Sequence, residues 1–300
     1  MRIFGKGDTN MEKKSIYKGA LILVATSWGS GFPITKIALE SGIAPNALMS
    51  IRFLVTALIL FIYLKFAGEK PTRSEIKLGL GAGLVLGLAF SLQTVGLFYT
   101  TSSKNAFITG AYVVMVPFIS WLITKEKPKS IIYFASFLCL FGIGFLSLDG
   151  DFSVNYGDFL TFVCAIFFAL QMSIIGATIK GKNPVIVNTF QMLSAGILTF
   201  VLNILFENFS LISTKLNTVQ VLAIGFLVIC NTMIAYLVQT AAQRYVAAST
   251  TSLILSTEIL FGALASVIFM GDILTIKMLF GGILIFASVV LAEGDFKLKK

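Results

Sequence analysis

The sequence has 300 residues, of which 57% are hydrophobic and only 12% charged, and its mean hydropathy is +0.92. Soluble domains average roughly 25% charged residues, so this chain has too little polar surface to cover a water-soluble globule. The net charge is +9, but the basic residues stand in short clusters between apolar runs and form no patch with interleaved aromatic residues. The composition indicates a membrane protein with lipid as its surroundings and argues against nucleic acid as a partner.

Ten apolar runs are long enough to cross a bilayer as helices, because a hydrocarbon core of about 30 Å needs roughly 20 helical residues. Spanning strands would be about 10 residues long with strict alternation of apolar and polar residues, so helices fit these runs better. The ten predicted helices, in chain order, are 17–38, 46–66, 78–99, 105–124, 131–148, 158–179, 185–206, 219–243, 246–270 and 276–292.

The polar segment 1–16 lacks the apolar stretch and cleavage site of a signal peptide, so we expect a cytoplasmic tail, with translation starting at Met1 or Met11. Ten spans put both termini on one side of the membrane. Eighteen Lys and Arg residues fall on that side and four on the other. Since an excess of Lys and Arg marks cytoplasmic loops, we predict that both termini are cytoplasmic.

The first two spans carry unusual residues inside the membrane. Trp28 lies mid-span, although Trp is enriched at interfaces, so it is either a packed aromatic residue or part of a cavity wall, and Trp28 and Phe32 are candidates for the site. Gly29, Gly31 and Pro33 follow, and such a group either breaks a helix to free backbone groups for a ligand or forms a kink that packing absorbs.

Arg52 lies about two turns into the second span from its outer end. It could bind a substrate carboxylate, pair with Glu258, or extend its side chain to the outer interface, as we expect of Lys36 at the end of the first span.

The third to eighth spans supply small and polar residues. Glycines recur every fourth residue at Gly79, Gly83 and Gly87, which predicts close helix packing or a sliding gate. Tyr112 lies mid-span in the fourth run, ahead of a kink expected at Pro117. Amide side chains in the later spans are candidates for ligand contacts or for hydrogen bonds between helices: Gln171, Asn188, Gln191 and Asn231.

Glu258 is the side chain that costs most to insert, since it lies near the middle of the ninth predicted span. A charge at the helix centre costs roughly 2.5–3.5 kcal/mol on insertion scales. Such a residue either couples transport to protons or binds an amine, or it is a structural acid that is protonated or hydrogen-bonded to a neighbouring helix. Both interpretations stay open.

Metal, cofactor and enzyme chemistry find no support in the sequence. Cys139, Cys164 and Cys230 stand singly inside apolar runs, and there is no histidine. A zinc site, a disulfide framework and a histidine-based nucleophile relay therefore all lack residues. No phosphate-binding GxxxxGK[ST] loop or HExxH motif occurs either. We expect no metal, no cofactor and no enzymatic activity, with proton coupling left open.

The sequence repeats itself at a shift of 146 residues. Polar as well as apolar positions coincide: Gly79 with Gly225, Gln93 with Gln239, Tyr99 with Tyr245, Tyr112 with Glu258, and Glu126 with Asp272. Each half contains five spans, an odd number, so the second half enters the membrane from the opposite side. We predict two inverted five-helix repeats, 17–149 and 150–293, followed by a basic tail at 294–300. Inverted repeats are typical of secondary transporters.

Several segments resemble the drug/metabolite transporter superfamily in its EamA-like branch. WGSGFPITK is similar to the family's first-span pattern, RFLVTALIL to its Arg-Phe element, and the segments 101–128 and 245–272 to its two half signatures. The family often has Glu-Pro in the second signature, whereas here Ile259 follows Glu258, and its closing acid is commonly Glu where this chain has Asp272. The resemblance implies a ten-helix bundle in the bacterial cytoplasmic (inner) membrane and export of amino acids, related metabolites or drugs.

The predicted function is secondary transport of a small-molecule substrate, most simply the export of metabolites such as amino acids by alternating access. The alternatives are an exporter of lipophilic cations with Glu258 as counter-ion, and a channel or a membrane scaffold without transport. Oligomeric state is left open. The candidate substrate-binding or coupling residues are Glu258, Trp28, Tyr112, Arg52, Gln171, Asn231, Phe32 and Gln191.

Overall fold

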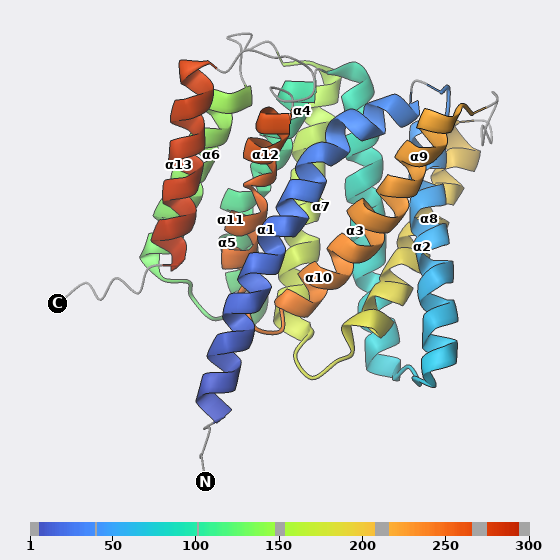
Figure 1. Cartoon of the computed structure of the whole chain (residues 1–300), viewed down its shortest axis with the longest axis horizontal. Coiled ribbons are helices and arrows are strands. Elements are labelled where there is room, and N and C mark those ends of the chain that lie inside the picture. The colour runs from blue at the N-terminus through green and yellow to red at the C-terminus, as the bar shows by residue number, and fades with distance from the viewer. Residues whose placement is uncertain are drawn as a thin grey trace, which may run out of the picture.

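Every regular element in the part of the chain that the computed structural model describes is a helix (Figure 1). The described residues are 6–39, 41–100, 102–147, 154–207, 216–265 and 275–293. The helices are α1 Lys6–Leu39, α2 Pro45–Ala67, α3 Arg73–Tyr99, α4 Ser102–Gly110, α5 Tyr112–Thr124, α6 Ser130–Ser147, α7 Tyr156–Thr178, α8 Pro184–Phe206, α9 Thr218–Phe226, η1 Leu227–Ile234, α10 Ala235–Ala242, α11 Ala248–Leu255, α12 Glu258–Ala265 and α13 Ile276–Glu293.

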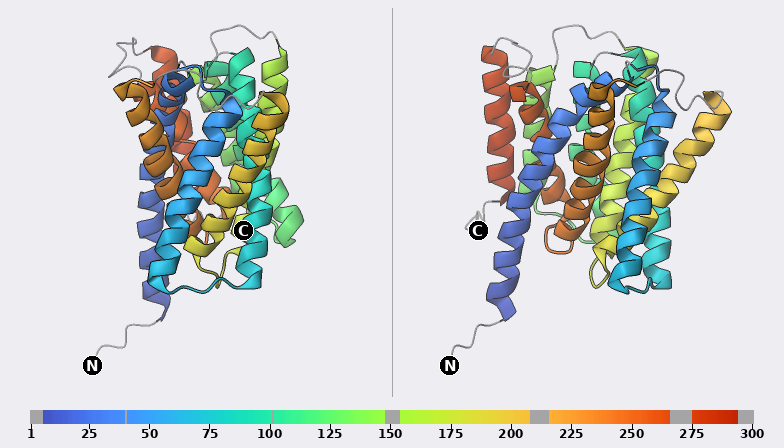
Figure 2. Two further views of the ribbon diagram at one scale, coloured as in Figure 1. Left: turned by 90° about the vertical axis from the view of Figure 1, so that its right-hand side faces the viewer. Right: turned by 45° about the vertical axis from the view of Figure 1, so that its right-hand side comes forward.

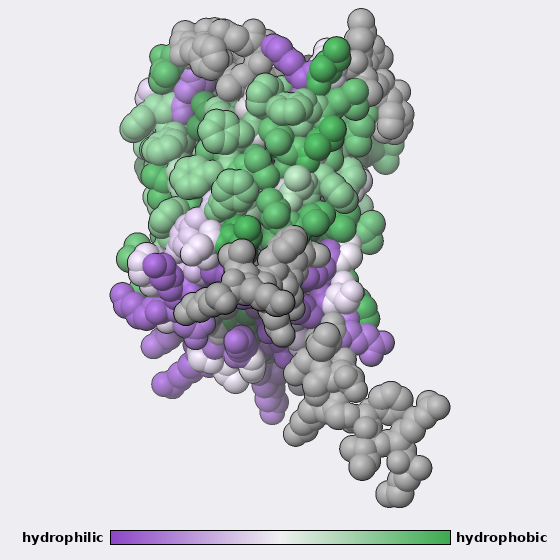
Figure 3. Space-filling view, turned by 90° about the vertical axis from the view of Figure 1, so that its left-hand side faces the viewer, coloured by the Kyte–Doolittle hydropathy of each residue, from purple (hydrophilic) through white to green (hydrophobic). Residues whose placement is uncertain are grey.

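Six helical stretches are long and apolar enough to cross a membrane: Pro45–Ala67, Arg73–Tyr99, Asn105–Thr124, Tyr156–Thr178, Pro184–Phe206 and Thr218–Ala242. Two shorter apolar stretches, Ser130–Phe145 and Leu279–Ala292, accompany them. Many large apolar side chains are exposed, and Figure 3 shows an apolar belt with hydrophilic side chains gathered below it. The protein is therefore an all-helical, multi-pass membrane protein, while the count of ten spans stays a prediction.

Local sequence signals explain where several of these helices begin. Pro45 and Pro184 open α2 and α8, where the missing proline N–H has no intrahelical partner to lose. Thr72 and Glu75 form a capping box at the start of α3, in which each side chain bonds the other residue's backbone N–H. These signals are local, since each involves residues within one turn of the helix start.

Helices α2, α3, α7 and α8 form a closely packed group, in which α3 lies along α7 and α8, and α2 lies along α8 (Figure 2). The glycines of α3 permit this approach. A Cβ added at Gly79 would lie 2.6 Å from the Phe190 Cβ, and one added at Gly83 would overlap the Gln191 carbonyl oxygen. Of the two roles predicted for this glycine stripe, the structure shows the packing role.

Two carboxylates join the ends of these helices across the fold. The Glu207 carboxylate, just after α8, accepts hydrogen bonds at 3.0 and 2.8 Å from the Asn46 backbone N–H and side-chain amide at the start of α2. Glu75 accepts one at 2.7 Å from the Asn183 N–H before α8. Acids at helix starts satisfy N–H groups that have no intrahelical partner, so these contacts stabilise the packed group.

Helix α1 runs unbroken through Pro33 from Lys6 to Leu39, so it begins within the segment predicted as a tail. The break at Gly29, Gly31 and Pro33, one of the two possibilities for the first span, does not occur. The glycines instead permit close contacts. A Cβ at Gly29 would overlap the Glu258 carbonyl oxygen, and one at Gly31 would overlap the Asn231 side chain.

Three other predicted spans are irregular. The fourth is divided at Ala111 into α4 and α5, and α5 continues through Pro117, where the kink was expected. The ninth is divided at Ser256 and Thr257, so Glu258 is the first residue of α12. The sequence had suggested that Glu258 lies inside one continuous helix, and that prediction is wrong. The eighth contains the π-helical segment η1. π-Helical turns inside α-helices occur frequently at functional sites.

Element boundaries repeat along the chain. A shift of 146 residues carries the first residues of α4, α5 and α6 onto those of α11, α12 and α13, and the last residue of α6 onto that of α13. A shift of 139 carries Pro45–Ala67 onto Pro184–Phe206. The broken segments run in opposite directions, since Figure 1 places α4 above α5 but α12 above α11. Both observations support a repeat of inverted orientation.

Candidate functional site

A central cavity is enclosed by residues from both halves of the chain. Its empty space is about 780 Å³, counted with the part that opens to solvent. Its lining residues are Trp28, Gly31, Thr35, Arg52, Phe90, Gln93, Thr94, Leu97, Asn105, Thr109, Tyr112, Phe168, Gln171, Met172, Asn231, Tyr236, Gln239 and Glu258. Two pairs related by the 146-residue shift, Gln93 with Gln239 and Tyr112 with Glu258, face this one cavity.

Glu258 is the acid of the cavity and is held there by the break before α12. Its side chain is 7% exposed, and none of the described residues gives its carboxylate a hydrogen bond. Close approach of α1 at Gly29 fixes the backbone of this turn, since a Cβ there would also lie 2.7 Å from the Gly262 N. A buried carboxylate without partners is costly, so a ligand or a proton is the natural partner for it.

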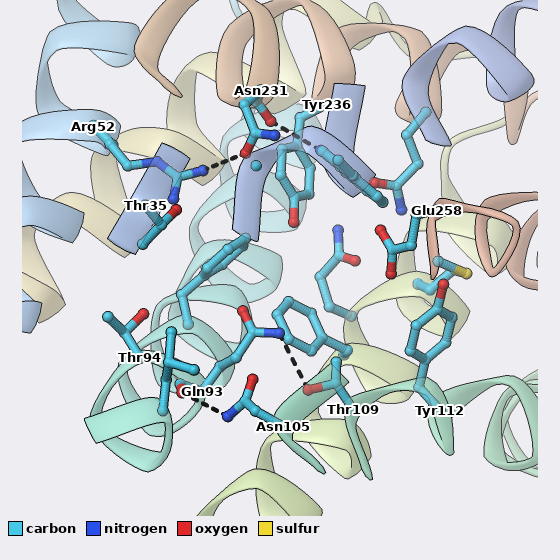
Figure 4. A pocket seen from close by; sticks show the side chains of 18 residues that line it. Thr35, Arg52, Gln93, Thr94, Asn105, Thr109, Tyr112, Asn231, Tyr236 and Glu258 are labelled. Carbon is cyan, nitrogen blue, oxygen red and sulfur yellow. Dashed lines mark hydrogen bonds between the residues drawn. The ribbon is translucent and has the colours of Figure 1, made fainter. Parts of the chain in front are cut away.

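Tyr112 opens α5 on the other side of the same space. Its hydroxyl is buried and has no hydrogen-bond partner among the described residues. Figure 4 shows this hydroxyl and the Glu258 carboxylate pointing toward one another from two helices. The structure thus places together two residues that the sequence repeat aligned.

Arg52 is the basic residue that lines the cavity, and it is 2% exposed. Its Nη2 donates to Asn231 Oδ1 at 2.8 Å and to Thr232 Oγ1 at 3.0 Å, and its Nε donates to Thr232 Oγ1 at 3.1 Å. The guanidinium also lies 5.3 Å from the Phe90 ring centroid. Extension to the outer interface, one of three expectations for this residue, is therefore wrong, because polar groups inside the bundle hold the side chain.

Pairing between Arg52 and Glu258 is also wrong for this structure. Both side chains belong to the described part of the chain, and no ion pair joins them. Figure 4 shows them on opposite sides of the cavity, with Tyr236 between them. The site therefore presents a buried cation and a buried carboxylate that are separated from one another.

Asn231 in η1 connects three helices at the cavity wall. Besides accepting from Arg52, it donates from Nδ2 to the Ser27 carbonyl at 3.0 Å. Its own carbonyl accepts from Trp28 Nε1 at 2.9 Å. The Trp28 ring lies 5.2 Å from the Tyr236 ring, so α1, α2, η1 and α10 are fixed relative to one another at this residue.

Three candidate residues remain, Gln171, Gln191 and Phe32, and only the first of them is seen to line the cavity. Gln171 lines the cavity and donates from Nε2 to Gln191 Oε1 at 3.3 Å. Gln191 is buried behind it and does not reach the cavity, so its place is in support of Gln171. Phe32 lies on α1, but its side chain is outside the described residues. Of the eight candidates, six line the cavity together.

Several residues that line the cavity were not predicted as site residues from the sequence. Phe90, Phe168 and Tyr236 form one aromatic cluster, with ring centroids 5.1 Å apart for Phe90–Phe168 and 6.2 Å for Phe90–Tyr236. Nothing distinguishes them in sequence from the many other aromatic residues of the spans. Gln93 and Gln239 did carry a signal, because polar residues coincided there in the repeat.

Comparison with known proteins gives the chain its family. The model of the EamA-like transporter family matches twice, over residues 17–148 and 155–293. An uncharacterized transporter of Archaeoglobus fulgidus is 34% identical over 91% of this chain and 84% of its own. The uncharacterized inner membrane transporter YedA of Escherichia coli is 25% identical over 72% of this chain and 71% of its own.

A crystal structure with the same fold is also known. It has a TM-score of 0.72 at 15% identity and covers 92% of this chain and 96% of its own chain. At that identity the likeness shows the fold alone. The family match spans nearly the whole chain, and the protein belongs to the EamA-like transporter family of membrane transporters.

Proposed function

We propose that this protein is a secondary transporter that exports small metabolites, such as amino acids, across the cytoplasmic membrane by alternating access. The observation that carries the proposal is the central cavity, with a buried guanidinium on one side and a buried carboxylate on the other. A zwitterion fits these two charges, with its carboxylate toward Arg52 and its ammonium toward Glu258. The relatives that are named as transporters support the general class.

Arg52 keeps a donor for such a ligand. Its Nη1 has only the Met49 sulfur, at 3.7 Å, as a partner, and a thioether is a weak acceptor. The other guanidinium nitrogens are bound to Asn231 and Thr232, which orients the free edge. Between the charges, the aromatic rings of the cavity provide apolar surface for a side chain.

Alternating access would follow from the inverted repeat. Two repeat-equivalent tyrosine pairs lie at opposite helix ends. Tyr17 of α1 stacks on Tyr245 after α10, with centroids 5.1 Å apart and planes at 13°. Tyr156 of α7 meets Tyr99 of α3 edge-on, at 5.6 Å and 75°. A shift of 139 residues relates Tyr17 to Tyr156, and a shift of 146 relates Tyr99 to Tyr245. We assign the two pairs as the cytoplasmic and the outer gate.

The two gates differ in what surrounds them. Next to Tyr99 and Tyr156, the Thr100 hydroxyl donates to Asp158 at 2.5 Å, and a Cβ at Gly157 would lie 2.6 Å from the Gly96 carbonyl oxygen. The seam between α3 and α7 is thus the more firmly closed. At the other pair, the Tyr245 ring also has the Lys13 ammonium at 6.0 Å and the Arg244 guanidinium at 5.8 Å from its centroid.

The orientation in the membrane follows the charge distribution. Figure 1 places the start of α1 and the end of α13 at the same side of the bundle. Hydrophilic side chains gather at that side in Figure 3. With the excess of Lys and Arg in the same loops, we propose that both termini are cytoplasmic.

The test begins with thermal stabilisation of the purified protein by amino acids, other metabolites and cationic drugs. A ligand that binds the folded state raises the midpoint by mass action. The best ligand is then used in counterflow with proteoliposomes, where a transporter accumulates labelled substrate transiently and a channel does not. Saturable counterflow supports the proposal, whereas flux without saturation, or no flux with any stabilising ligand, would exclude it.

A second candidate is the export of lipophilic cations, favoured by a single carboxylate among aromatic rings. Cations bind aromatic faces, most strongly when they are desolvated. In that case cationic dyes would stabilise the protein and compete with one another, and amino acids would have no effect. The same panel of ligands separates the two candidates.

A further inference from the structure

We infer that the central cavity contains a subsite for a monovalent cationic group, formed by the Glu258 carboxylate and the Gln239 amide oxygen of the second half and the Tyr112 hydroxyl of the first. This inference deepens the proposed function and rests on it for the role of the cavity in transport. It concerns binding, however, and can be measured without any flux.

Two of the three groups, those of Gln239 and Tyr112, are buried without a hydrogen-bond partner, which is rare inside proteins. Gln239 is 1% exposed, and its Oε1 has no hydrogen-bond partner among the described residues. The Tyr112 hydroxyl is in the same state at 4% exposure, and none of those residues donates a hydrogen bond to the Glu258 carboxylate. All three residues line the one cavity. Unpartnered oxygens at one place point to a ligand that supplies positive charge or hydrogen-bond donors.

The two glutamines related by the repeat have different surroundings. In the first half, Gln93 Nε2 donates to Thr109 Oγ1 at 3.2 Å, from α3 to α4. A shift of 146 residues carries Gln93 onto Gln239 and Thr109 onto Leu255. Leu255 is fully buried in α11 and has no polar group to offer. The internal hydrogen bond that holds the Gln93 amide in the first half therefore has no counterpart at Gln239, whose amide lines the cavity without it.

The donor set decides the class of ligand. A primary ammonium has three N–H donors, which matches three oxygen acceptors. A divalent ion such as Ca²⁺ takes six to eight oxygen ligands, usually with several carboxylates, and within the described ranges no three His, Cys, Asp or Glu residues come together. Two sources of the monovalent charge remain, the ammonium group of a transported metabolite and a free Na⁺ ion.

The experiment measures the unfolding midpoint of the full-length protein in detergent during titration with n-propylammonium chloride or sodium chloride. Choline chloride at the same ionic strength is the reference, because a quaternary ammonium has no N–H donor. Glu258→Gln is expected to weaken the apparent affinity at least about tenfold, and Gln239→Leu or Tyr112→Phe about three- to tenfold. Gly81→Ala, on α3 outside the cavity lining and with open space for the new Cβ, should leave the response to cations within about twofold of wild type.

A shift with propylammonium alone assigns the subsite to a substrate ammonium, and a shift with Na⁺ as well assigns it to a free cation; both support the inference. No shift beyond choline, or a shift unchanged in Glu258→Gln, would overturn it. If Glu258→Gln does not fold, Tyr112→Phe, which loses a single hydroxyl, decides instead. A cation response without counterflow would count against the proposed function and leave the subsite in place, whereas counterflow without a cation response would do the reverse.

Discussion

The segment from α3 to α6 and the segment from α9 to α13 have corresponding helices in the same order, but they contribute different side chains to the cavity and its surroundings. In the first, α3 is an uninterrupted α-helix that packs through Gly83 against Gln191 of α8. In the second, η1 interrupts the equivalent helix, and its Asn231 and Thr232 hold Arg52 of α2. A shift of 139 residues relates Arg52 to Gln191, and a shift of 146 relates Gly83 to Ile229, within one turn of Asn231, so the two contacts lie close to the same place in the repeat.

A few substitutions between repeat-equivalent positions account for this difference. Val85 and Leu86 of α3 correspond to Asn231 and Thr232, so only the second half has side chains that can satisfy a buried guanidinium. Tyr112 corresponds to Glu258 in the same way. The two halves thus share the positions of their helices, and the polar residues present in only one half form the site. Substitutions at paired positions test whether the two halves differ in this way.

Glu258→Gln should have the largest effect. It removes the only carboxylate among the residues that line the cavity, so substrate counterflow should fall at least about 30-fold, as for loss of one partner from a buried charge pair. Tyr112→Phe, at the equivalent position, should reduce counterflow about fivefold by loss of one hydrogen bond. Unliganded unfolding midpoints check that both variants fold. Equal losses in the two variants would show that the halves do not differ as argued.

Asn231→Leu should lower the free energy of unfolding by about 3 kcal/mol, because it leaves the buried Arg52 guanidinium partly unsatisfied. Val85→Ile, at the equivalent place on α3, should change it by less than about 1.5 kcal/mol. Denaturant unfolding in detergent micelles measures both. A mild effect of Asn231→Leu would mean that η1 does not hold Arg52.

Gly83→Ala tests the first-half counterpart of that contact. The new Cβ would overlap the Gln191 carbonyl oxygen, and such overpacking should destabilise the protein by about 2 kcal/mol. Gly81 on the same helix has open space, so Gly81→Ala should be neutral or stabilising by up to about 1 kcal/mol. The same unfolding measurement applies, and similar values for the two glycines would contradict the packing described for α3 and α8.

The tyrosine gates should give the smallest energetic effects, since an aromatic pair contributes about 1 kcal/mol, or about fivefold in a two-state equilibrium. With a cysteine at Thr35 in the cavity as the only thiol, Tyr17→Leu should speed its reaction with an impermeant thiol reagent from the cytoplasmic side. Tyr156→Leu should slow it. Reaction rates in inverted vesicles give the comparison, and changes of the same sign in both variants would contradict the assignment of gates.

Sequence reasoning found the helical membrane class, the family and six residues that share the cavity. It succeeded where a single residue is costly to place in a membrane, as Glu258 is, or where polar residues coincide in the repeat. It left three possibilities open for Arg52, because the distance of a side chain from the interface does not say whether partners such as Asn231 and Thr232 lie inside the bundle. The break before Glu258 and the π-helical segment also lie where helices distant in sequence pack together, and a local sequence pattern does not predict such packing.

The most direct test of the central claim, one cavity opened alternately by two equivalent halves, is a pair of spin-label distances. After replacement of the native cysteines, labels go to the exposed positions Ile16 and Ala247 beside the first gate, and in a second protein to Phe98 and Val154 beside the other. On addition of a stabilising substrate, we predict that one distance lengthens while the other shortens or holds. Distances that both lengthen, or that both stay fixed during demonstrated transport, would contradict the account.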